Sequence, residues 1–228
     1  MSRDLDVDIP VAGSRIVGTL VIPNDARGIV VFAHGSGSGR FSPRNQFVAE
    51  VLRAAGFGTL LLDMLTPDEE RIDGATGHLR FDIALLASRV VGATDWLVEE
   101  RLLPSPHIGY FGASTGAAAA LVAAAKRPAT VSAIVSRGGR PDLAAGILGD
   151  VRAPTLLIVG EDDDNVVALN HAAWRELGGH PKDLRIIEGA SHLFEEPGAL
   201  DQVAELAREW FDHFLAPQPM LGMGAGAH

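Results

Sequence analysis

The chain has 228 residues, 47% of them hydrophobic, which is enough apolar material for the core of one α/β domain. It contains no cysteine, which excludes a disulfide framework, a thiolate zinc site and a cysteine nucleophile, and which fits a reducing, cytoplasmic compartment. The net charge of −10, without any run of Lys or Arg, argues against nucleic acid and anionic membranes as partners, and neither a signal peptide nor a membrane-spanning stretch is visible.

The chain begins with a pattern that is typical of an edge hairpin. Apolar and polar side chains alternate over residues 5–11, and together with residues 15–23 this segment predicts two antiparallel strands. After the hairpin, short apolar runs alternate with amphipathic segments. The expected strands lie at residues 28–33, 59–62, 108–111, 131–136, 155–159 and 184–187. The expected helices lie at residues 43–55, 81–98, 115–127, 169–177 and 203–214.

This order of elements predicts a single α/β domain over residues 1–215, with a mostly parallel, twisted sheet and helices on both faces. The polar segment 66–79 is expected to form a surface loop, and the Pro-, Gly- and Met-rich segment 216–228 a disordered tail. The three tryptophans lie on apolar helix faces and are expected in the core. In sheets of this kind, functional sites form at the carboxyl ends of the strands.

The most informative motif lies within residues 107–127. A short apolar strand leads into Gly112-Ala113-Ser114-Thr115-Gly116, and an alanine-rich helix follows at once. This is a G-x-S-x-G sequence between a strand and a helix, where the serine occupies a sharp turn and the glycines allow close approach of the chain. The free N–H groups at the start of the helix point to the place where negative charge develops when Ser114 attacks a carbonyl group.

Two further strand ends supply the partners that a serine nucleophile needs. The acidic residues Asp162, Asp163 and Asp164 follow one strand, and His192 follows the last one. The histidine would take the proton of Ser114, and a carboxylate would orient the imidazole, in the chain order Ser, Asp, His that is associated with this architecture.

The negative charge on the reacting carbonyl oxygen requires two hydrogen-bond donors. The N–H of Thr115 is well placed to be one of them. We expect the second from Ser36, which lies in a glycine-rich loop at the end of the strand at residues 28–33. His34, at the start of this loop, is expected to hold it by hydrogen bonds rather than to act in catalysis or bind a metal, and the remaining histidines show no metal-ligand spacing.

Together these motifs resemble the α/β-hydrolase superfamily, and more closely its small dienelactone-hydrolase-like members. In family order they are His34-Gly35-Ser36-Gly37, Gly112-Ala113-Ser114-Thr115-Gly116, Gly160-Glu161-Asp162-Asp163 with Val166, and Gly189-Ala190-Ser191-His192-Leu193-Phe194. The resemblance implies the α/β-hydrolase fold and no cofactor, and it registers Asp163 as the triad acid, with Asp162 and Asp164 as alternatives. Dienelactone hydrolase itself uses a cysteine nucleophile, which this chain lacks, so its substrate is not carried over.

A serine in this position is similar to that of carboxylic ester hydrolases, and we expect hydrolysis of a small-molecule ester through an acyl-enzyme. The short link between residues 136 and 155 leaves little room for a cap domain, which favours small or short-chain substrates. The alternatives are a thioester, an amide or a peracid as substrate of the same triad, or a catalytically silent fold that binds a small molecule or a partner protein. The edge hairpin and the final helix are candidate surfaces for a homodimer.

The candidate substrate contacts are Gly35, Arg40 and Arg137. Arg137 and Arg140 follow a strand whose end borders the expected cleft, so either could bind an anionic group of a substrate. The alternative is that they form ion pairs with Asp142 or Glu161 and fix a loop. Arg40 has the same two alternatives.

Overall fold

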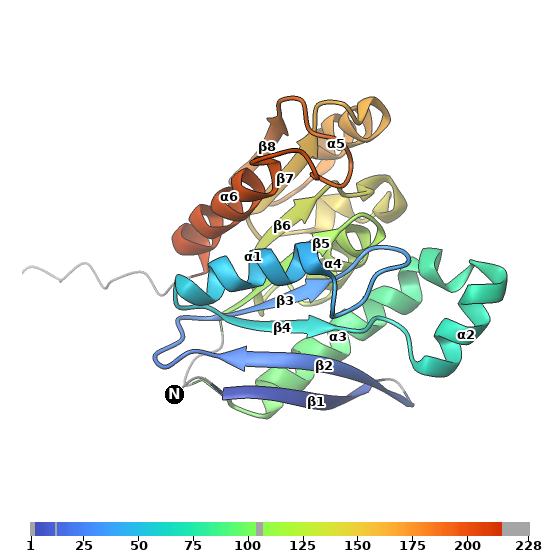
Figure 1. Cartoon of the computed structure of the whole chain (residues 1–228), viewed down its shortest axis with the longest axis vertical. Helices are drawn as coiled ribbons and strands as arrows, with labels where there is room; N and C mark the ends of the chain where they lie inside the picture. The colour runs from blue at the N-terminus through green and yellow to red at the C-terminus, as the bar shows by residue number, and fades with distance from the viewer. Residues whose placement is uncertain (1–2, 12, 104–106, 216–228) are drawn as a thin grey trace, which may run out of the picture.

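The computed structural model describes residues 3–11, 13–103 and 107–215. The tail predicted at residues 216–228 lies outside the described residues. The described chain forms one eight-stranded sheet with helices on both of its faces (Figure 1). Within this part of the chain, no helix is both long enough and apolar enough to cross a bilayer.

The strands follow one another across the sheet in the order β1-β2-β4-β3-β5-β6-β7-β8. Their bounds are β1 Arg3–Val11, β2 Ser14–Ile22, β3 Ile29–Ala33, β4 Gly58–Leu62, β5 Ile108–Ala113, β6 Val131–Arg137, β7 Thr155–Gly160 and β8 Lys182–Ile187. β1 pairs antiparallel with β2, and β2 antiparallel with β4, whereas the other neighbouring strands are parallel. The prediction of a mostly parallel sheet with a leading antiparallel hairpin is therefore confirmed.

The helices cover the sheet in two layers. Their bounds are α1 Pro43–Ala54, α2 Pro67–Thr76, α3 Ile83–Glu99, α4 Thr115–Lys126, α5 Asp164–Glu176 and α6 Ala199–Phe214, with short 3-10 helices η1 Leu79–Phe81, η2 Pro141–Ala144 and η3 Leu148–Asp150. α1 and α6 lie on one face, and α3, α4 and α5 lie on the other, while α2 lies beyond the ends of β3 and β4 (Figure 1).

The buried apolar side chains form two clusters, one on each face of the sheet. Every side chain of β3 and β5 is buried, because helices cover both faces there and an apolar run meets apolar partners on either side. The hairpin of β1 and β2 buries mainly one face, and only the end of β2 is buried on both. Its inward residues, Ile9, Ile16 and Leu20, join the cluster on the α3 side, which explains the alternating pattern of the sequence.

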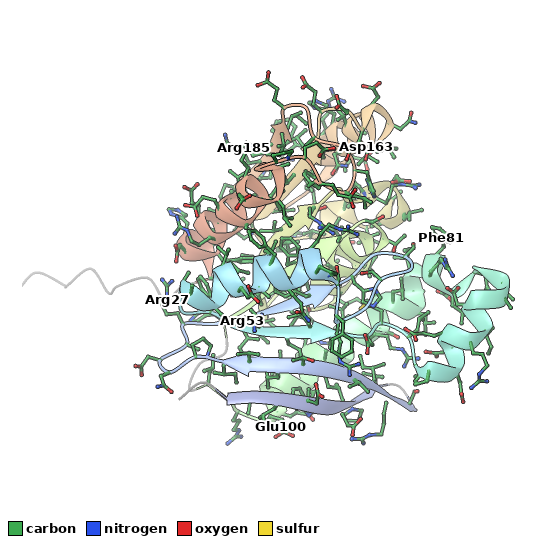
Figure 2. The ribbon with its side chains drawn as sticks, in the orientation of Figure 1. Arg27, Arg53, Phe81, Glu100, Asp163 and Arg185 are labelled. Atoms are coloured by element: carbon green, nitrogen blue, oxygen red, sulfur yellow. The ribbon has the colours of Figure 1, made fainter. Side chains whose placement is uncertain are left out.

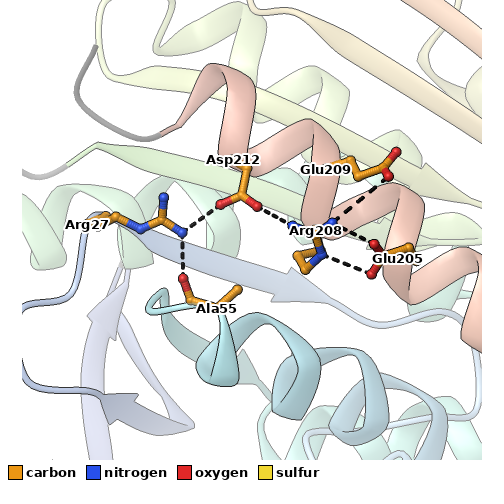
Figure 3. Close-up of polar contacts among 6 residues, drawn as sticks. All are labelled: Arg27, Ala55, Glu205, Arg208, Glu209 and Asp212. Atoms are coloured by element: carbon orange, nitrogen blue, oxygen red, sulfur yellow. Dashed lines mark hydrogen bonds and ion pairs between the residues drawn. The ribbon is translucent and has the colours of Figure 1, made fainter. Parts of the chain in front are cut away.

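A network of charged side chains holds α6 against the chain that enters β3 (Figure 3). Arg27 donates to the Ala55 carbonyl at 2.5 Å and to the Asp212 carboxylate at 2.6 Å. Arg208 binds the same Asp212 and also Glu205. Because these groups are partly exposed, each pair adds little stability, and their main effect is to fix the position of α6 on α1.

Two expectations about local structure are wrong. Residues 66–79 contain the helix α2 rather than a loop, because Thr66 and Glu69 form a capping box: the Thr66 hydroxyl accepts from the Glu69 N–H at 3.2 Å, and the Glu69 carboxylate accepts from the Thr66 N–H at 2.8 Å. Trp174 is 38% exposed rather than part of the core, because its ring lies against Lys182 of the edge strand β8.

Candidate active site

Ser114 sits alone in the sharp turn between β5 and α4. Its backbone has φ 50° and ψ −120°, a left-handed region that non-glycine residues rarely adopt. Backbone hydrogen bonds from both sides hold it there: its N–H donates to the Arg137 carbonyl at 3.2 Å, and its carbonyl accepts from the N–H of Arg140 at 3.1 Å. A strained residue that its surroundings fix in this way is typical of a functional site.

The two glycines of the motif make this turn sterically feasible. A Cβ atom on Gly116 would lie 2.2 Å from the carbonyl oxygen of Ala33, at the end of β3, and one on Gly112 would lie 2.4 Å from the Cα of Ala117 in α4. No larger residue fits at these distances. The close approach presses the first turn of α4 against the end of β3, which brings the N–H groups of that turn near the loop after β3.

His192 and Asp163 form a hydrogen-bonded pair at the ends of β8 and β7. The imidazole Nδ1 lies 2.5 Å from a carboxylate oxygen of Asp163. Figure 2 labels Asp163 at the carboxyl end of the sheet, where β7 passes into α5. Because Nδ1–H donates to the carboxylate, Nε2 is the ring nitrogen that remains to accept a proton. Of the three neighbouring acids, Asp164 instead begins α5, and the N–H of Asp162 donates to the Ala190 carbonyl.

One cavity of about 280 Å³ brings the expected nucleophile and the expected base together. Its lining includes Ser114 and His192, together with Ser36, Arg137 and Leu193. The side chain of His192 is partly exposed at this cavity, whereas the Asp163 carboxylate behind it is more buried. Both side chains therefore border one space that a small molecule can reach from solvent.

The loop after β3 lies directly against the nucleophile. A Cβ atom on Gly35 would lie 2.9 Å from the Cβ of Ser114, so only glycine allows this approach. The hydroxyl groups of Ser36 and Thr115 are 3.3 Å apart, which places the two expected oxyanion donors on adjacent segments. The N–H of Thr115 opens α4 and has no partner inside that helix.

Both ring nitrogens of His34 hold this loop in place. Nε2 accepts from the Met64 N–H at 3.0 Å, and Nδ1 therefore carries the proton and donates to the Gly35 carbonyl at 2.8 Å. Burial of the imidazole lowers the pKa of His34 below its ordinary value, which keeps this neutral form. Within the described residues, no group of three or more His, Asp or Glu side chains is arranged to hold a metal ion.

A second cavity of about 250 Å³ extends from the loop after β3 toward α2. It shares Gly35, Ser36 and Ser38 with the first cavity, and Thr115 also lines it. Its apolar wall comes from Met64, Leu65 and Leu86, and its polar rim from Glu70, Asp73 and Arg80. An apolar chain attached to a carbonyl group near Ser114 could occupy this space.

The arginines that the sequence singled out lie in different environments. Arg40 forms an ion pair with Asp63, close to the oxyanion loop. Arg140 forms two hydrogen bonds with Asp142, at 2.8 and 2.7 Å. Arg137 alone of these three lines the cavity that holds Ser114 and His192.

Two residues in or beside this cavity, Arg44 and Gly138, were not among the site residues expected from the sequence. Arg44, from the first turn of α1, lines it beside Arg137. Gly138 has φ 51°, and a Cβ atom there would lie 3.4 Å from Cε1 of His192, so glycine lets the loop after β6 run beside the imidazole. The pair Gly138-Gly139 after β6 is a sequence signal for such a close approach of the backbone. No sequence pattern indicates that Arg44 reaches this cavity.

Comparison with known proteins agrees with this architecture. A dienelactone hydrolase from Anabaena variabilis is 60% identical, with a TM-score of 0.89 over 94% of this chain and 99% of that one. Est1E from Butyrivibrio proteoclasticus has a TM-score of 0.75 over 91% of this chain and 98% of that one, at 16% identity, and so shares the fold. The dienelactone hydrolase-like phosphotriesterase P91 from metagenomic libraries has a TM-score of 0.72 over 94% and 99% of the two chains, at 20% identity.

Two curated relatives, from Mycobacterium tuberculosis strains CDC 1551 and H37Rv, are 55% identical over 218 residues. Both are provisionally named phosphoribosyl transferases. The match covers 95% of this chain but 48% of each relative, so the chain spans about half the length of these proteins. No family model matches the chain.

The strand order and the structural neighbours define an α/β-hydrolase fold. Because it is 60% identical to the Anabaena protein over nearly the whole of both chains, this chain belongs to the dienelactone hydrolase family. The resemblance that the four sequence motifs indicated is confirmed.

Proposed function

We propose that this protein hydrolyses carboxylic esters with small or short-chain acyl groups, with Ser114 as nucleophile, His192 as base and Asp163 as the acid that orients it. The observation that carries the proposal is the pairing of Asp163 with Nδ1 of His192 at 2.5 Å, in a cavity that the strained Ser114 also lines. This combination supports a role for the free Nε2 of His192 as the acceptor of the proton from the Ser114 hydroxyl group.

In the proposed first step, Ser114 Oγ attacks the ester carbonyl carbon while His192 Nε2 takes the hydroxyl proton. The carbonyl oxygen becomes an oxyanion, which the N–H groups of Thr115 and Ser36 stabilise. When this intermediate collapses, the bond to the alcohol oxygen breaks, and the imidazolium gives its proton to the leaving alcohol. Asp163 stabilises the imidazolium throughout and does not itself take the proton.

In the second step, His192 removes a proton from water, and the resulting hydroxide attacks the acyl-enzyme. Collapse of the second intermediate releases the acid and returns the proton to Ser114. The apolar cavity beside Ser36 and Thr115 would accept the acyl chain. Its volume of about 250 Å³ is the basis for proposing small or short acyl groups.

The test is hydrolysis of p-nitrophenyl butyrate at neutral pH by the wild type, Ser114→Ala and Ser132→Ala. Ser132 lies on the neighbouring strand β6 but lines neither cavity. We expect Ser114→Ala to lower kcat/KM by about 10³-fold or more, because the nucleophile is lost, and Ser132→Ala to retain wild-type activity. Equal activity of the wild type and Ser114→Ala would refute nucleophilic catalysis at this serine.

Substrates with the same acyl group but different leaving groups then distinguish ester hydrolysis from the other reactions that the same triad could catalyse. An oxygen ester, a thioester and an amide with one common butyryl group, and perhydrolysis measured with hydrogen peroxide, distinguish ester hydrolysis from the three alternatives. A catalytically silent binding protein would show no turnover and no covalent labelling of Ser114 by a fluorophosphonate.

A further inference from the structure

Arg137 is a buried cation without a counter-ion. It is 8% exposed, and its Nε and Nη1 atoms are inaccessible to solvent and have no hydrogen-bond partner. Among the described residues, no carboxylate forms an ion pair with it. Burying an unpaired charge is costly, and proteins normally pair such a group.

The comparison with Arg89 shows how unusual this is within the same chain. Arg89 is even more deeply buried, at 3% exposed, but its guanidinium donates to the Glu69 carboxylate at 2.6 Å. Arg140, three residues beyond Arg137, likewise has the carboxylate of Asp142. The chain carries 29 acidic residues against 19 basic ones, so a shortage of carboxylates does not explain the lone Arg137.

A second cation lies beside Arg137. Arg44 lines the same cavity, and its Nε is also buried without a partner. Among the described residues, Arg44 pairs with one carboxylate, that of Glu195, at 3.1 Å. The side chain of Glu195 is 65% exposed, so solvent screens the pair. Burial first, and then the charge of Arg44, lowers the pKa of Arg137 to about 10, which still leaves it protonated at neutral pH.

The helices around the cavity add to this positive potential. Arg44 lies in the first turn of α1, and Ser114 precedes the first turn of α4. Neither first turn contains an acidic residue, so the positive ends of both helix dipoles remain uncompensated by side chains of their own helix. A protein of net charge −10 thus concentrates positive charge around its nucleophile.

We propose that Arg137, together with Arg44, forms a subsite for an anionic group of the substrate next to Ser114. This inference rests on the proposed function, and it narrows the substrates to esters that carry a carboxylate or a phosphate-type group beside the scissile bond. A planar guanidinium recognises either group through paired N–H···O bonds. Two guanidinium groups in one wall favour a phosphate-type dianion, because a single carboxylate neutralises only one of them.

Three methyl esters of equal chain length test the subsite: methyl butyrate, monomethyl succinate and methyl phosphonopropanoate. They end in a methyl, a carboxylate and a phosphonate group respectively. We expect the wild type to hydrolyse at least one of the charged esters with a higher kcat/KM than methyl butyrate. In Arg137→Met, which keeps the length of the side chain and removes its charge, the ratio of charged to neutral kcat/KM should fall by roughly tenfold to a hundredfold.

Arg140→Met is the matched control, since it removes the ion-paired arginine of the same loop and should retain the wild-type ratio. If Arg137→Met lowers the charged-to-neutral ratio for monomethyl succinate alone, the subsite binds a carboxylate. If it lowers the ratio for methyl phosphonopropanoate alone, the subsite binds a phosphate-type group. The proposal is overturned if the wild type does not prefer either charged ester, or if Arg137→Met loses activity on all three esters in the same proportion.

Binding separates failure of the subsite from failure of the ester chemistry. In the Ser114→Ala background, calorimetry with monomethyl succinate and methyl phosphonopropanoate should show a Kd that Arg137→Met raises by roughly tenfold or more. This result stands even if no ester is hydrolysed. Binding of neither compound to Ser114→Ala would overturn the subsite, whatever the wild type does with p-nitrophenyl butyrate.

Thermal unfolding distinguishes ligand binding from a purely structural role of Arg137, because the two roles predict changes of opposite sign in the Tm of Arg137→Met. If the charge is retained for a ligand, its replacement by an apolar side chain of similar length should raise the Tm of the free protein by a few degrees, on the order of 1 kcal/mol of stability. A lower Tm for Arg137→Met, without any change in the ratio of charged to neutral esters, would assign the residue to packing.

Discussion

Single residues hold the loop after β3 against Ser114, and His34 is the clearest case. Its ring accepts a hydrogen bond from the Met64 N–H and donates one to the carbonyl of Gly35, the residue that lies against Ser114. A protonated imidazole would place a second N–H against the Met64 N–H. The folded state therefore disfavours protonation, in agreement with the lowered pKa of His34.

This residue should make the stability of the fold depend on pH. Because the pKa of His34 is lower in the folded state, the unfolded chain takes up a proton near pH 6.5 that the folded chain refuses, so stability is complete above that pH and falls below it. The loss from this one group amounts to at most about 1.4 kcal/mol per pH unit. We expect urea unfolding at pH 7, 6 and 5 to show a smaller loss for His34→Gln than for the wild type.

The control for this measurement is His171→Gln, which changes an exposed histidine on α5 and should leave the pH dependence as in the wild type. The same slope in the wild type and in His34→Gln would show that His34 does not couple protonation to folding.

At the scale of elements, α2 and α3 together enclose the cavity proposed for the acyl chain. Glu69 links them, because it caps α2 through the Thr66 N–H and also accepts from Arg89 of α3. Asp73 of α2 accepts from the N–H and the guanidinium of Arg80, which follows in η1. These bonds set the position of α2, and the apolar side chains beneath it set the length of the cavity.

Shortening Leu86 of α3 should therefore change the preferred acyl length. Leu86→Ala lengthens the apolar cavity, and we expect the ratio of kcat/KM for p-nitrophenyl octanoate over butyrate to rise by roughly tenfold. The same change should cost about 2–5 kcal/mol of stability, because Leu86 is buried. Leu97→Ala, from the buried face of the same helix but outside the cavity, should cost as much stability without altering the ratio. A similar shift in both variants would argue against this cavity as the acyl site.

At the scale of the whole molecule, the sheet separates two apolar cores that do not share side chains. Ile9 belongs to the core on the α3 side, whereas Phe57 and Phe211 belong to the core under α1 and α6, with their ring centroids 6.3 Å apart. Contacts across the sheet pass through the backbone of the strands. Substitutions on opposite faces should therefore act independently, and those on one face should not.

Double substitutions measure this separation. In urea unfolding, we expect the losses of stability from Ile9→Val and Phe211→Leu to add within about 0.5 kcal/mol, since the two side chains share no partners. Phe57→Leu and Phe211→Leu should deviate from additivity by roughly 0.5 kcal/mol or more, because the rings touch. Coupling between Ile9 and Phe211 as strong as that between the two rings would contradict the picture of two separate cores.

Much of this protein could be predicted from its sequence, because the decisive signals are local. Apolar runs such as Ile29–Ala33 become strands that are buried on both faces wherever helices follow in alternation, and the strand–turn–helix context of Ser114 fixes its place at a strand end. The parallel order of the strands then brings the loops of Ser114, His192 and the acidic cluster to one edge of the sheet. The capping box of α2 is also a local signal, although the polar composition of the segment favours a loop.

Only the tertiary structure decided which side chain of each loop reaches the site. Asp163 rather than either neighbour contacts His192, and Arg137 rather than Arg140 lines the cavity of Ser114, because the backbone path of each loop sets the direction of its side chains. Arg44 reaches the same cavity from a helix about ninety positions away in the chain, which no local pattern encodes. Periodicity determines the helices, the strands and the loops at their ends. The packing of these elements determines which side chains are buried, and it leaves the Arg137 side chain buried without a counter-ion.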